Sequence, residues 1–238
     1  MKLSPRLLAV TSFVEKGSRV ADVGTDHGYV PIWLIEEGIA ESALAMDVRK
    51  GPLERAESHI RLHGLEDRIS TRLSDGLKEL NAGEADTVVI AGMGGELVIH
   101  IMEEGRHVRD TVRHWVLSPQ SELDKVRRYL EEQGFVTLDE TMLIDEEKYY
   151  TVMSVRGPEG SGGHVPAAGA MSEAEYLYGR CLIKKKDPVL REYLEKEKRT
   201  LSAIREQLDG QDSEGAARRR CEIEHQISII EEVQHEMR

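Results

Sequence analysis

Apolar runs alternate with stretches of helical periodicity from residue 4 to residue 156 of this 238-residue chain. The apolar runs predict strands at residues 19–23, 42–47, 69–73, 86–91 and 114–117. The periodic stretches predict helices at residues 4–14, 29–36, 51–63, 96–103 and 121–133. Residues 135–156 alternate in two further runs, which predict an antiparallel pair of strands. This order is typical of an α/β fold in which helices cover a parallel sheet.

A different pattern follows residue 157. Residues 158–170 are rich in glycine, proline and alanine and lack periodicity, so we expect a linker between a domain at 1–157 and a second at 171–238. In the second domain, apolar residues recur at steps of four and three on either side of a polar turn, at Leu190, Leu194, Leu201, Ile204, Leu208, Ile223, Ile227, Ile230 and Met237. This spacing predicts an antiparallel coiled-coil hairpin, with a dimerising coiled coil as the alternative. The short heptad runs favour the hairpin, supported by a short helix at 171–183.

The composition is that of a charge-rich protein, with 32% charged residues and a net charge of −12. The chain has no run of about 18 apolar residues, no apolar signal core at its start, and no ligand-like neighbours for Cys181 and Cys221. We therefore expect a cytoplasmic protein without a metal site. The acidic balance argues against a nucleic-acid partner, but the lysines at 184–186 and the arginines at 218–220 are candidate basic patches or, alternatively, solvated helix faces.

The segment VADVGTDHGYVP, residues 20–31, is the most informative for function. A buried strand ends at Val23 and continues through a glycine turn into a helix, which places free backbone N–H groups at the carboxyl end of a strand. Asp26 occupies the position where a dinucleotide fingerprint has its second glycine, and a carboxylate there repels a pyrophosphate. A ligand without phosphate and with a cationic end fits better, and S-adenosylmethionine is such a ligand. His27 is more readily explained as a loop histidine bonded to backbone than as a general base.

Three further segments follow the next three predicted strands. Asp47 lies 23 positions beyond Gly24, near the spacing at which an acidic residue binds ribose hydroxyls. Residues 74–76 (SDG) offer a carboxylate for an adenine amino group. Residues 91–95 (AGMGG) contain three glycines, which leave the backbone open beside a reacting group. Each segment alone could be a helix cap or a turn, but the four together predict a nucleoside-cofactor site.

Seven strings spread over the first domain resemble one family in order: LSPRL (3–7), DVGTDHGYVPI (22–32), MDVRKGPL (46–53), HGLEDRI (63–69), SDGL (74–77), IAGMGG (90–95) and LSPQ (117–120). This family is the TrmK family of bacterial tRNA (adenine-N1)-methyltransferases, which belong to the Rossmann-like class I enzymes that use S-adenosylmethionine. The LSPQ segment departs from the Gln-Pro-type pattern expected there. The resemblance implies a methyltransferase domain followed by a small all-α coiled-coil hairpin domain.

The resemblance also implies an activity and a set of site residues. The chain would transfer a methyl group from S-adenosylmethionine to N1 of adenine 22 of tRNA, without a metal. The implied cofactor-binding residues are Arg6, Asp22, Gly24, Thr25, Asp26, His27, Gly28, Asp47, Val48, Asp75, Gly76, Ala91 and Gly92. Catalysis would fall to Asp26, Met93 and Gly94. We expect tRNA as partner and a monomer, with a dimer as the alternative.

Two other functions remain compatible with these residues. The chain could be a methyltransferase of the same fold that acts on a small molecule or a protein, which suits its acidic balance. It could instead be a non-catalytic cofactor-binding module that uses the hairpin for association. The intact carboxylates Asp22, Asp47 and Asp75 favour a working site, and Asp26 disfavours a nicotinamide-dependent oxidoreductase.

Overall fold

The computed structural model describes residues 2–158, 170–211 and 213–238. The chain divides into two compact units, Met1–Ala168 and Gly169–Arg238. The boundary falls within the predicted linker, most of which (residues 159–169) lies outside the described residues, so the linker stays a prediction. None of the helices in the described part combines the length and apolar character that crossing a bilayer requires.

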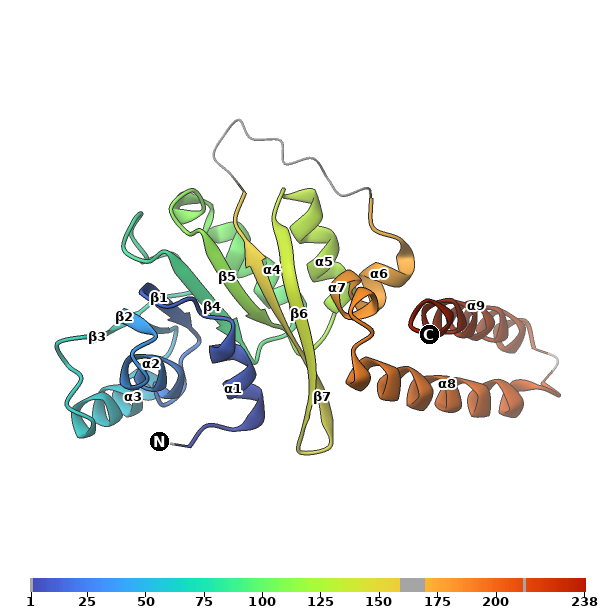
Figure 1. Ribbon diagram of the computed structural model, residues 1–238. Helices are drawn as coiled ribbons and strands as arrows, with labels where there is room; N and C mark the ends of the chain where they lie inside the picture. The colour runs from blue at the N-terminus through green and yellow to red at the C-terminus, as the bar shows by residue number, and fades with distance from the viewer. Residues whose placement is uncertain (1, 159–169, 212) are drawn as a thin grey trace. The chain divides into compact units, whose positions relative to one another are not determined.

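A mixed sheet organises the first unit (Figure 1), and among the described residues its strands run in the order β3-β2-β1-β4-β5-β7-β6. The strands are β1 (Ser18–Val23), β2 (Ala40–Asp47), β3 (Ile69–Leu73), β4 (Thr87–Ala91), β5 (His114–Ser118), β6 (Val136–Asp145) and β7 (Lys148–Arg156). The first five pair in parallel, whereas β7 pairs antiparallel with both β5 and β6. This confirms the predicted Rossmann-like α/β fold and the antiparallel pair at its end.

Helices cover both faces of this sheet because alternate strand residues point to opposite faces. In β4, Val89 packs with the apolar residues of α1 (Pro5–Ser12), α2 (Tyr29–Glu36) and α3 (Lys50–Leu62). Its neighbours Val88 and Ile90 pack instead with α4 (Gly95–Glu104) and α5 (Leu123–Glu132). All three valine and isoleucine side chains are fully buried, and each such burial stabilises the fold by about 1.5–3 kcal/mol. The sheet is therefore a rigid frame for the loops at its edges.

One predicted helix start is corrected by a local backbone feature. The sequence pattern places the fifth helix at residues 121–133, but α5 begins at Leu123. Glu122 adopts a left-handed conformation with φ 48°, which interrupts the helix. Its carboxylate accepts a hydrogen bond from the backbone N–H of Gly95 at 3.1 Å, so Glu122 holds the start of α4 instead of extending α5.

The second unit is helical, with α6 (Glu173–Tyr178), α7 (Arg180–Lys184), α8 (Pro188–Leu208) and α9 (Glu214–Glu236). The short helix predicted at 171–183 is broken in two by Gly179, whose φ is 89°. Arg191 donates to the carbonyl of Met237 at 3.1 Å and Lys198 pairs with Glu231 at 2.9 Å, which sets α8 and α9 antiparallel. The hairpin is thus observed, while its coiled-coil packing remains a prediction.

The seam between α8 and α9 contains most of the predicted apolar positions. The buried positions are Leu190, Leu194, Ile223, Ile227, Ile230 and Met237, whereas Leu201, Ile204 and Leu208 are half-buried. Glu197 occupies the one step of the pattern where an apolar residue is missing. It accepts a hydrogen bond from the hydroxyl of Tyr178 in α6 at 3.0 Å, and burial raises the pKa of its carboxyl.

Candidate functional site

The four predicted segments meet at one edge of the sheet, because the carboxyl ends of parallel strands lie at the same edge. Backbone hydrogen bonds join neighbouring loops there. The N–H groups of Gly24 and Thr25 donate to Met46 in β2 at 2.8 and 2.9 Å. The N–H of Ser74 donates to Asp47 at 2.9 Å, and that of Gly92 to Ser118 at 3.1 Å. The structure therefore brings the loops after β1, β2, β3 and β4 together.

The loop after β1 has a backbone that most residues adopt only with strain. Gly24, His27 and Gly28 have φ values of 79°, 63° and 70°. A Cβ at Gly24 would overlap Cε of Met93, so the β1 loop packs directly on the AGMGG segment. A Cβ at Gly28 would lie 3.3 Å from Cβ of Ala56 in α3. The glycines of this loop serve close packing as well as a left-handed turn.

Asp26 lies at the rim of the site and is not an isolated carboxylate. Its side chain is 65% exposed, and Oδ1 accepts a hydrogen bond from Nη2 of Arg55 in α3 at 2.6 Å. This hydrogen bond is the main reason that the pKa of Asp26 lies below its usual value. The sequence argument that Asp26 alone repels a phosphate is therefore weakened, because Arg55 compensates its charge.

A second residue of α3 also holds this loop. Nδ1 of His59 lies 2.9 Å from the carbonyl oxygen of His27, which it reaches as a donor when that nitrogen carries a proton. The rings of His27, Tyr29 and His59 are nearly parallel, with centroids 5.1–5.5 Å apart. Nδ1 of His27 is buried without a hydrogen-bond partner among the described residues. The expectation that this ring bonds to backbone is wrong, since the His27 carbonyl is the bonded group.

Two buried carboxylates lie beneath the loop, one in β1 and one at the end of β2. Asp22 and Asp47 are each 7% exposed. Burial, with a smaller contribution from the nearby charge of Asp47, raises the pKa of Asp22 from 3.8 to about 6. Oδ1 of Asp47 accepts the N–H of Arg49 at 2.8 Å. A side-chain hydrogen bond with Thr25 opposes the rise in the pKa of Asp22. Beside these carboxylates, Val48 exposes 59% of its surface.

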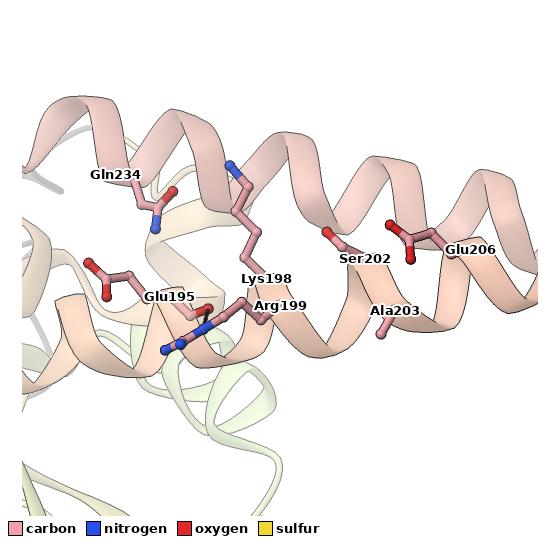
Figure 2. A pocket seen from close by; sticks show the side chains of 7 residues that line it. All are labelled: Glu195, Lys198, Arg199, Ser202, Ala203, Glu206 and Gln234. Atoms are coloured by element: carbon pink, nitrogen blue, oxygen red, sulfur yellow. Dashed lines mark hydrogen bonds between the residues drawn. The ribbon is translucent and has the colours of Figure 1, made fainter.

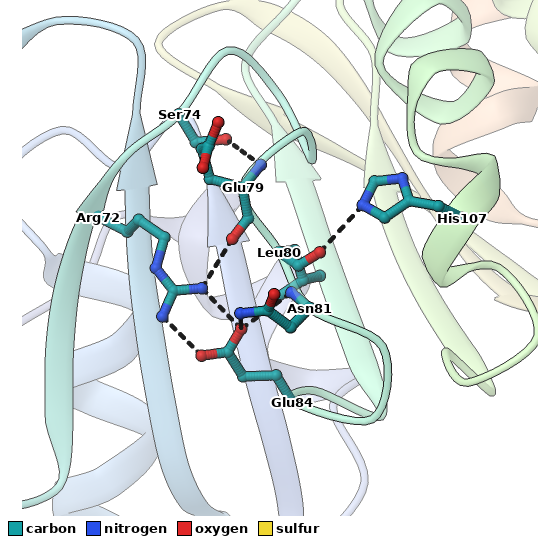
Figure 3. A network of polar contacts seen from close by, with 7 residues as sticks. All are labelled: Arg72, Ser74, Glu79, Leu80, Asn81, Glu84 and His107. Atoms are coloured by element: carbon teal, nitrogen blue, oxygen red, sulfur yellow. Dashed lines mark hydrogen bonds and ion pairs between the residues drawn. The ribbon is translucent and has the colours of Figure 1, made fainter.

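The segment after β3 is fixed by a polar network (Figure 3). Arg72 pairs with Glu84 through two contacts of 2.6 Å and also donates to the carbonyl of Glu79 at 2.8 Å. The hydroxyl of Ser74 donates to the carbonyl of Gly76 at 2.8 Å. The network holds the turn that presents Asp75 at the sheet edge.

Asp75 itself faces solvent, with a 60% exposed side chain that pairs with Lys78 at 2.7 Å. This contact lowers the pKa of Asp75. Gly76 has φ 60° and packs against Ile101 of α4, which a Cβ would approach to 3.1 Å. The two residues thus differ in role: Asp75 is available to a ligand, and Gly76 allows a close approach between the turn and α4.

Side chains from other elements come close to both Gly92 and Gly94 in the segment after β4. At Gly92, whose φ is 83°, a Cβ would lie 3.2 Å from Nη1 of Arg6 and 3.9 Å from Nε2 of Gln120. At Gly94 it would lie 3.2 Å from Oγ of Ser121. A Cβ would therefore meet a side-chain atom at the same distance at both glycines, and the role of Gly94 beside a reacting group stays a prediction.

Arg6, which the family resemblance assigns to the cofactor site, comes close to this edge from α1. Its guanidinium lies over the ring of Tyr150 in β7, 5.4 Å from the centroid, and Nη1 comes close to Gly92. Next to it, Oγ of Ser118 at the end of β5 is buried and has no partner among the described residues. The sequence interpretation missed Arg55 and His59 as functional candidates. Ser118 and Gln120 lie in the LSPQ segment, to which it assigned no role.

The basic patches of the second unit differ in exposure and pairing. Arg218 and Arg219 pair with Glu222 at 3.4 and 2.9 Å, which fits the alternative of a solvated helix face. The lysines at 184–186 are all exposed.

A separate hollow of about 570 Å³ lies along the hairpin (Figure 2) and is lined by both acidic and basic residues. The lining residues are Glu195, Lys198, Arg199, Ser202, Ala203, Glu206 and Gln234. None of the predicted site residues lines it. The described residues contain no cluster of His, Cys, Asp or Glu that could hold a metal ion.

Comparison with known proteins first defines the class. The profile of a family described as "Methyltransferase domain" matches residues 3–153, so the chain has a methyltransferase domain. A curated relative, the tRNA (adenine(22)-N(1))-methyltransferase of Bacillus subtilis (strain 168), is 30% identical over 234 residues, 98% of this chain and 97% of that protein. The chain belongs to the family of tRNA (adenine(22)-N(1))-methyltransferases.

Solved structures agree with this assignment. The crystal structure of the B. subtilis m1A22 tRNA methyltransferase TrmK has a TM-score of 0.84 and 30% identity, and covers 98% of this chain and 99% of that one. A candidate tRNA (m1A22) methyltransferase from Streptococcus pneumoniae, solved in complex with S-adenosyl-L-methionine, has a TM-score of 0.85 and 31% identity. That likeness covers 98% of this chain and all of the S. pneumoniae chain.

Proposed function

We propose that the protein transfers a methyl group from S-adenosylmethionine to N1 of adenine 22 in tRNA. The observation that carries this proposal is the near full-length match to a curated enzyme of that activity. The site at the carboxyl edge of the sheet is independently suited to the cofactor. Curated ribosomal protein L11 methyltransferases match only 53% and 40% of this chain, so the tRNA activity is favoured over that alternative.

The side chains at the sheet edge fit S-adenosylmethionine by their chemistry. One buried side-chain atom there, Nδ1 of His27, has no partner among the described residues and suits the polar methionine end. Asp47 uses one carboxylate oxygen for Arg49 and can accept ribose hydroxyls with the other. Val48 is exposed and apolar, as the face of an adenine requires, and Asp75 can accept from its amino group. Bound there, the cofactor would supply a methyl group already activated by the sulfonium.

The protein's contribution to the reaction is mainly placement. Adenine N1 carries a lone pair at neutral pH, so no proton has to leave N1 before attack. Residues that hold N1 beside the methyl group of the bound cofactor would supply most of the acceleration by placement. The product base is cationic, and we assign its stabilisation to acceptors at the rim, the backbone carbonyls of residues 91–94 and Asp26. Met93, which packs on Gly24, would form the floor between cofactor and base.

Access to N1 requires that the adenine leave its stack, because N1 lies on the Watson–Crick edge. We place the extruded base beside Gly92, where the polar ends of the Arg6 and Gln120 side chains come close to the backbone. The body of the tRNA would be held through phosphates by the exposed lysines at 184–186. We further propose that the enzyme acts in the cytoplasm and as a monomer.

The proposed function is tested with two unmodified tRNA transcripts that differ only at position 22. The protein, incubated with S-adenosylmethionine, should methylate the transcript with adenine and leave the one with guanine unmodified. Methylation of both transcripts would contradict the assignment of the target, and methylation of neither would contradict the tRNA activity. Binding of S-adenosylhomocysteine, measured by calorimetry, separates loss of cofactor binding from loss of the reaction.

A further inference from the structure

The loop after β5 is tied to the loop after β4, and this places one side chain beside the proposed acceptor base. The N–H of Gly92 donates to the carbonyl of Ser118 at 3.1 Å, and the N–H of Gln120 donates to the carbonyl of Met93 at 2.8 Å. Both bonds join main-chain atoms, so changing the Gln120 side chain leaves them in place. The two loops therefore form one fixed unit at the sheet edge.

The Gln120 side chain comes close to Gly92, the glycine that Arg6 also approaches. Its Nε2 lies 3.9 Å from where a Cβ on Gly92 would be, and Nη1 of Arg6 lies 3.2 Å from the same point. The residue is exposed, and its side chain makes no hydrogen bond to the described residues. An exposed amide with both donor and acceptor capacity is thus available where the acceptor base is proposed to enter.

We propose that Gln120 is a specificity-determining residue that reads the Hoogsteen edge of the acceptor adenine, an inference that rests on the proposed function. Its Oε1 accepts from the N6 amino group and its Nε2 donates to N7, the bidentate pairing by which an amide recognises adenine. This pairing uses N6 and N7 and leaves N1 free for methyl transfer. Guanine presents two acceptors, O6 and N7, so Oε1 of Gln120 would face the carbonyl oxygen O6 without a hydrogen bond.

Arg6, the other side chain at Gly92, is unsuited to this task. A guanidinium carries only donors, whereas the adenine N6 amino group is itself a donor. The Arg6 guanidinium also lies over the ring of Tyr150, which restricts its orientation. Arg6 is better placed to meet a phosphate beside the extruded nucleotide, and this leaves the reading of the base to Gln120.

The inference is tested by changing the enzyme and the base together. Wild-type protein and Gln120→Ala are each assayed on tRNA with adenine or 7-deazaadenine at position 22; the analogue lacks the N7 acceptor and keeps N1 and N6. Replacing adenine by 7-deazaadenine should lower kcat/KM of the wild type about tenfold, the worth of one hydrogen bond of the pair. Gln120→Ala should lose roughly 10- to 100-fold on adenine and lose nothing further on 7-deazaadenine.

Two controls separate recognition from structure. Gln120→Glu keeps the size of the side chain but offers only acceptors, so it should be impaired on adenine and recover in part on 7-deazaadenine. S-Adenosylhomocysteine affinity and the thermal midpoint should be unchanged in both variants. The inference is overturned if kcat/KM of Gln120→Ala on adenine equals that of the wild type. It is also overturned if 7-deazaadenine lowers kcat/KM of Gln120→Ala as much as it lowers that of the wild type. A wild-type protein that methylates no adenine-22 tRNA would instead overturn the proposed function, and this inference with it.

Discussion

Replacing Asp22 by asparagine removes a buried carboxylate whose ionisation destabilises the folded state. Asp22 lies in β1 (Ser18–Val23), is 7% exposed, and has its pKa raised to about 6 by burial and by the charge of Asp47. The folded state therefore favours the protonated form, whereas the unfolded chain ionises near the ordinary value of 3.8. At neutral pH the native protein carries this charge against the preference of its surroundings.

The size of the effect follows from the two pKa values. Each pKa unit corresponds to about 1.4 kcal/mol, so a rise from 3.8 to about 6 corresponds to roughly 3 kcal/mol of lost stability once both states are ionised. The penalty is absent below pH 3.8, grows between pH 3.8 and 6, and is constant above pH 6. The Asp22→Asn variant should thus be more stable than the wild type by up to about 3 kcal/mol at pH 8, and by about 1 kcal/mol at pH 4.5.

Urea unfolding between pH 4.5 and 8 measures this difference. Both tryptophans, Trp33 and Trp115, lie in the first unit, so their fluorescence reports its unfolding alone. The matched control is Asp67→Asn, which makes the same change of charge at an exposed position. The argument from burial would be refuted if the difference in unfolding free energy between Asp22→Asn and wild type did not change with pH. It would also be refuted if the variant were less stable than the wild type at pH 8.

Two further predictions concern the cofactor loop and the tRNA. Arg55→Met frees Asp26 from its 2.6 Å partner and should weaken S-adenosylhomocysteine binding severalfold in calorimetry, with Arg55→Lys restoring part of it; equal affinity in all three proteins would exclude a role for this contact. Alanine at both Lys184 and Lys186 should weaken tRNA binding and reduce the slope of log K against log salt by about 1 per lost phosphate contact, while a slope equal to that of the wild type would exclude these lysines.

The local pattern of the sequence was sufficient for most of the fold. The helix predicted at 29–36 and the strand at 69–73 coincide with α2 and β3. Both are bounded by residues with a clear local meaning, such as Gly28 at the start of α2, which has φ 70°. The errors occur where a distant contact decides the backbone, as at Glu122, whose carboxylate binds a group 27 residues away.

The sequence predicted where the residues of the candidate site lie better than it predicted which side chains they contact. The strand ends that carry Asp47, Asp75 and Gly92 could be located because parallel strands end at one edge. The pairing of Asp26 with Arg55, 29 residues further along the chain, could not be located, because periodicity gives no information on which side chain of α3 faces the β1 loop. The same holds for Gln120, whose significance depends on its approach to Gly92.

The most direct test of the account is transfer of labelled methyl groups from S-adenosylmethionine to total unmodified tRNA, followed by nucleoside analysis and mapping of the modified position. The account predicts 1-methyladenosine as the labelled nucleoside, located at position 22. Label in another nucleoside, or unlabelled tRNA from a protein that binds S-adenosylhomocysteine normally, would contradict it.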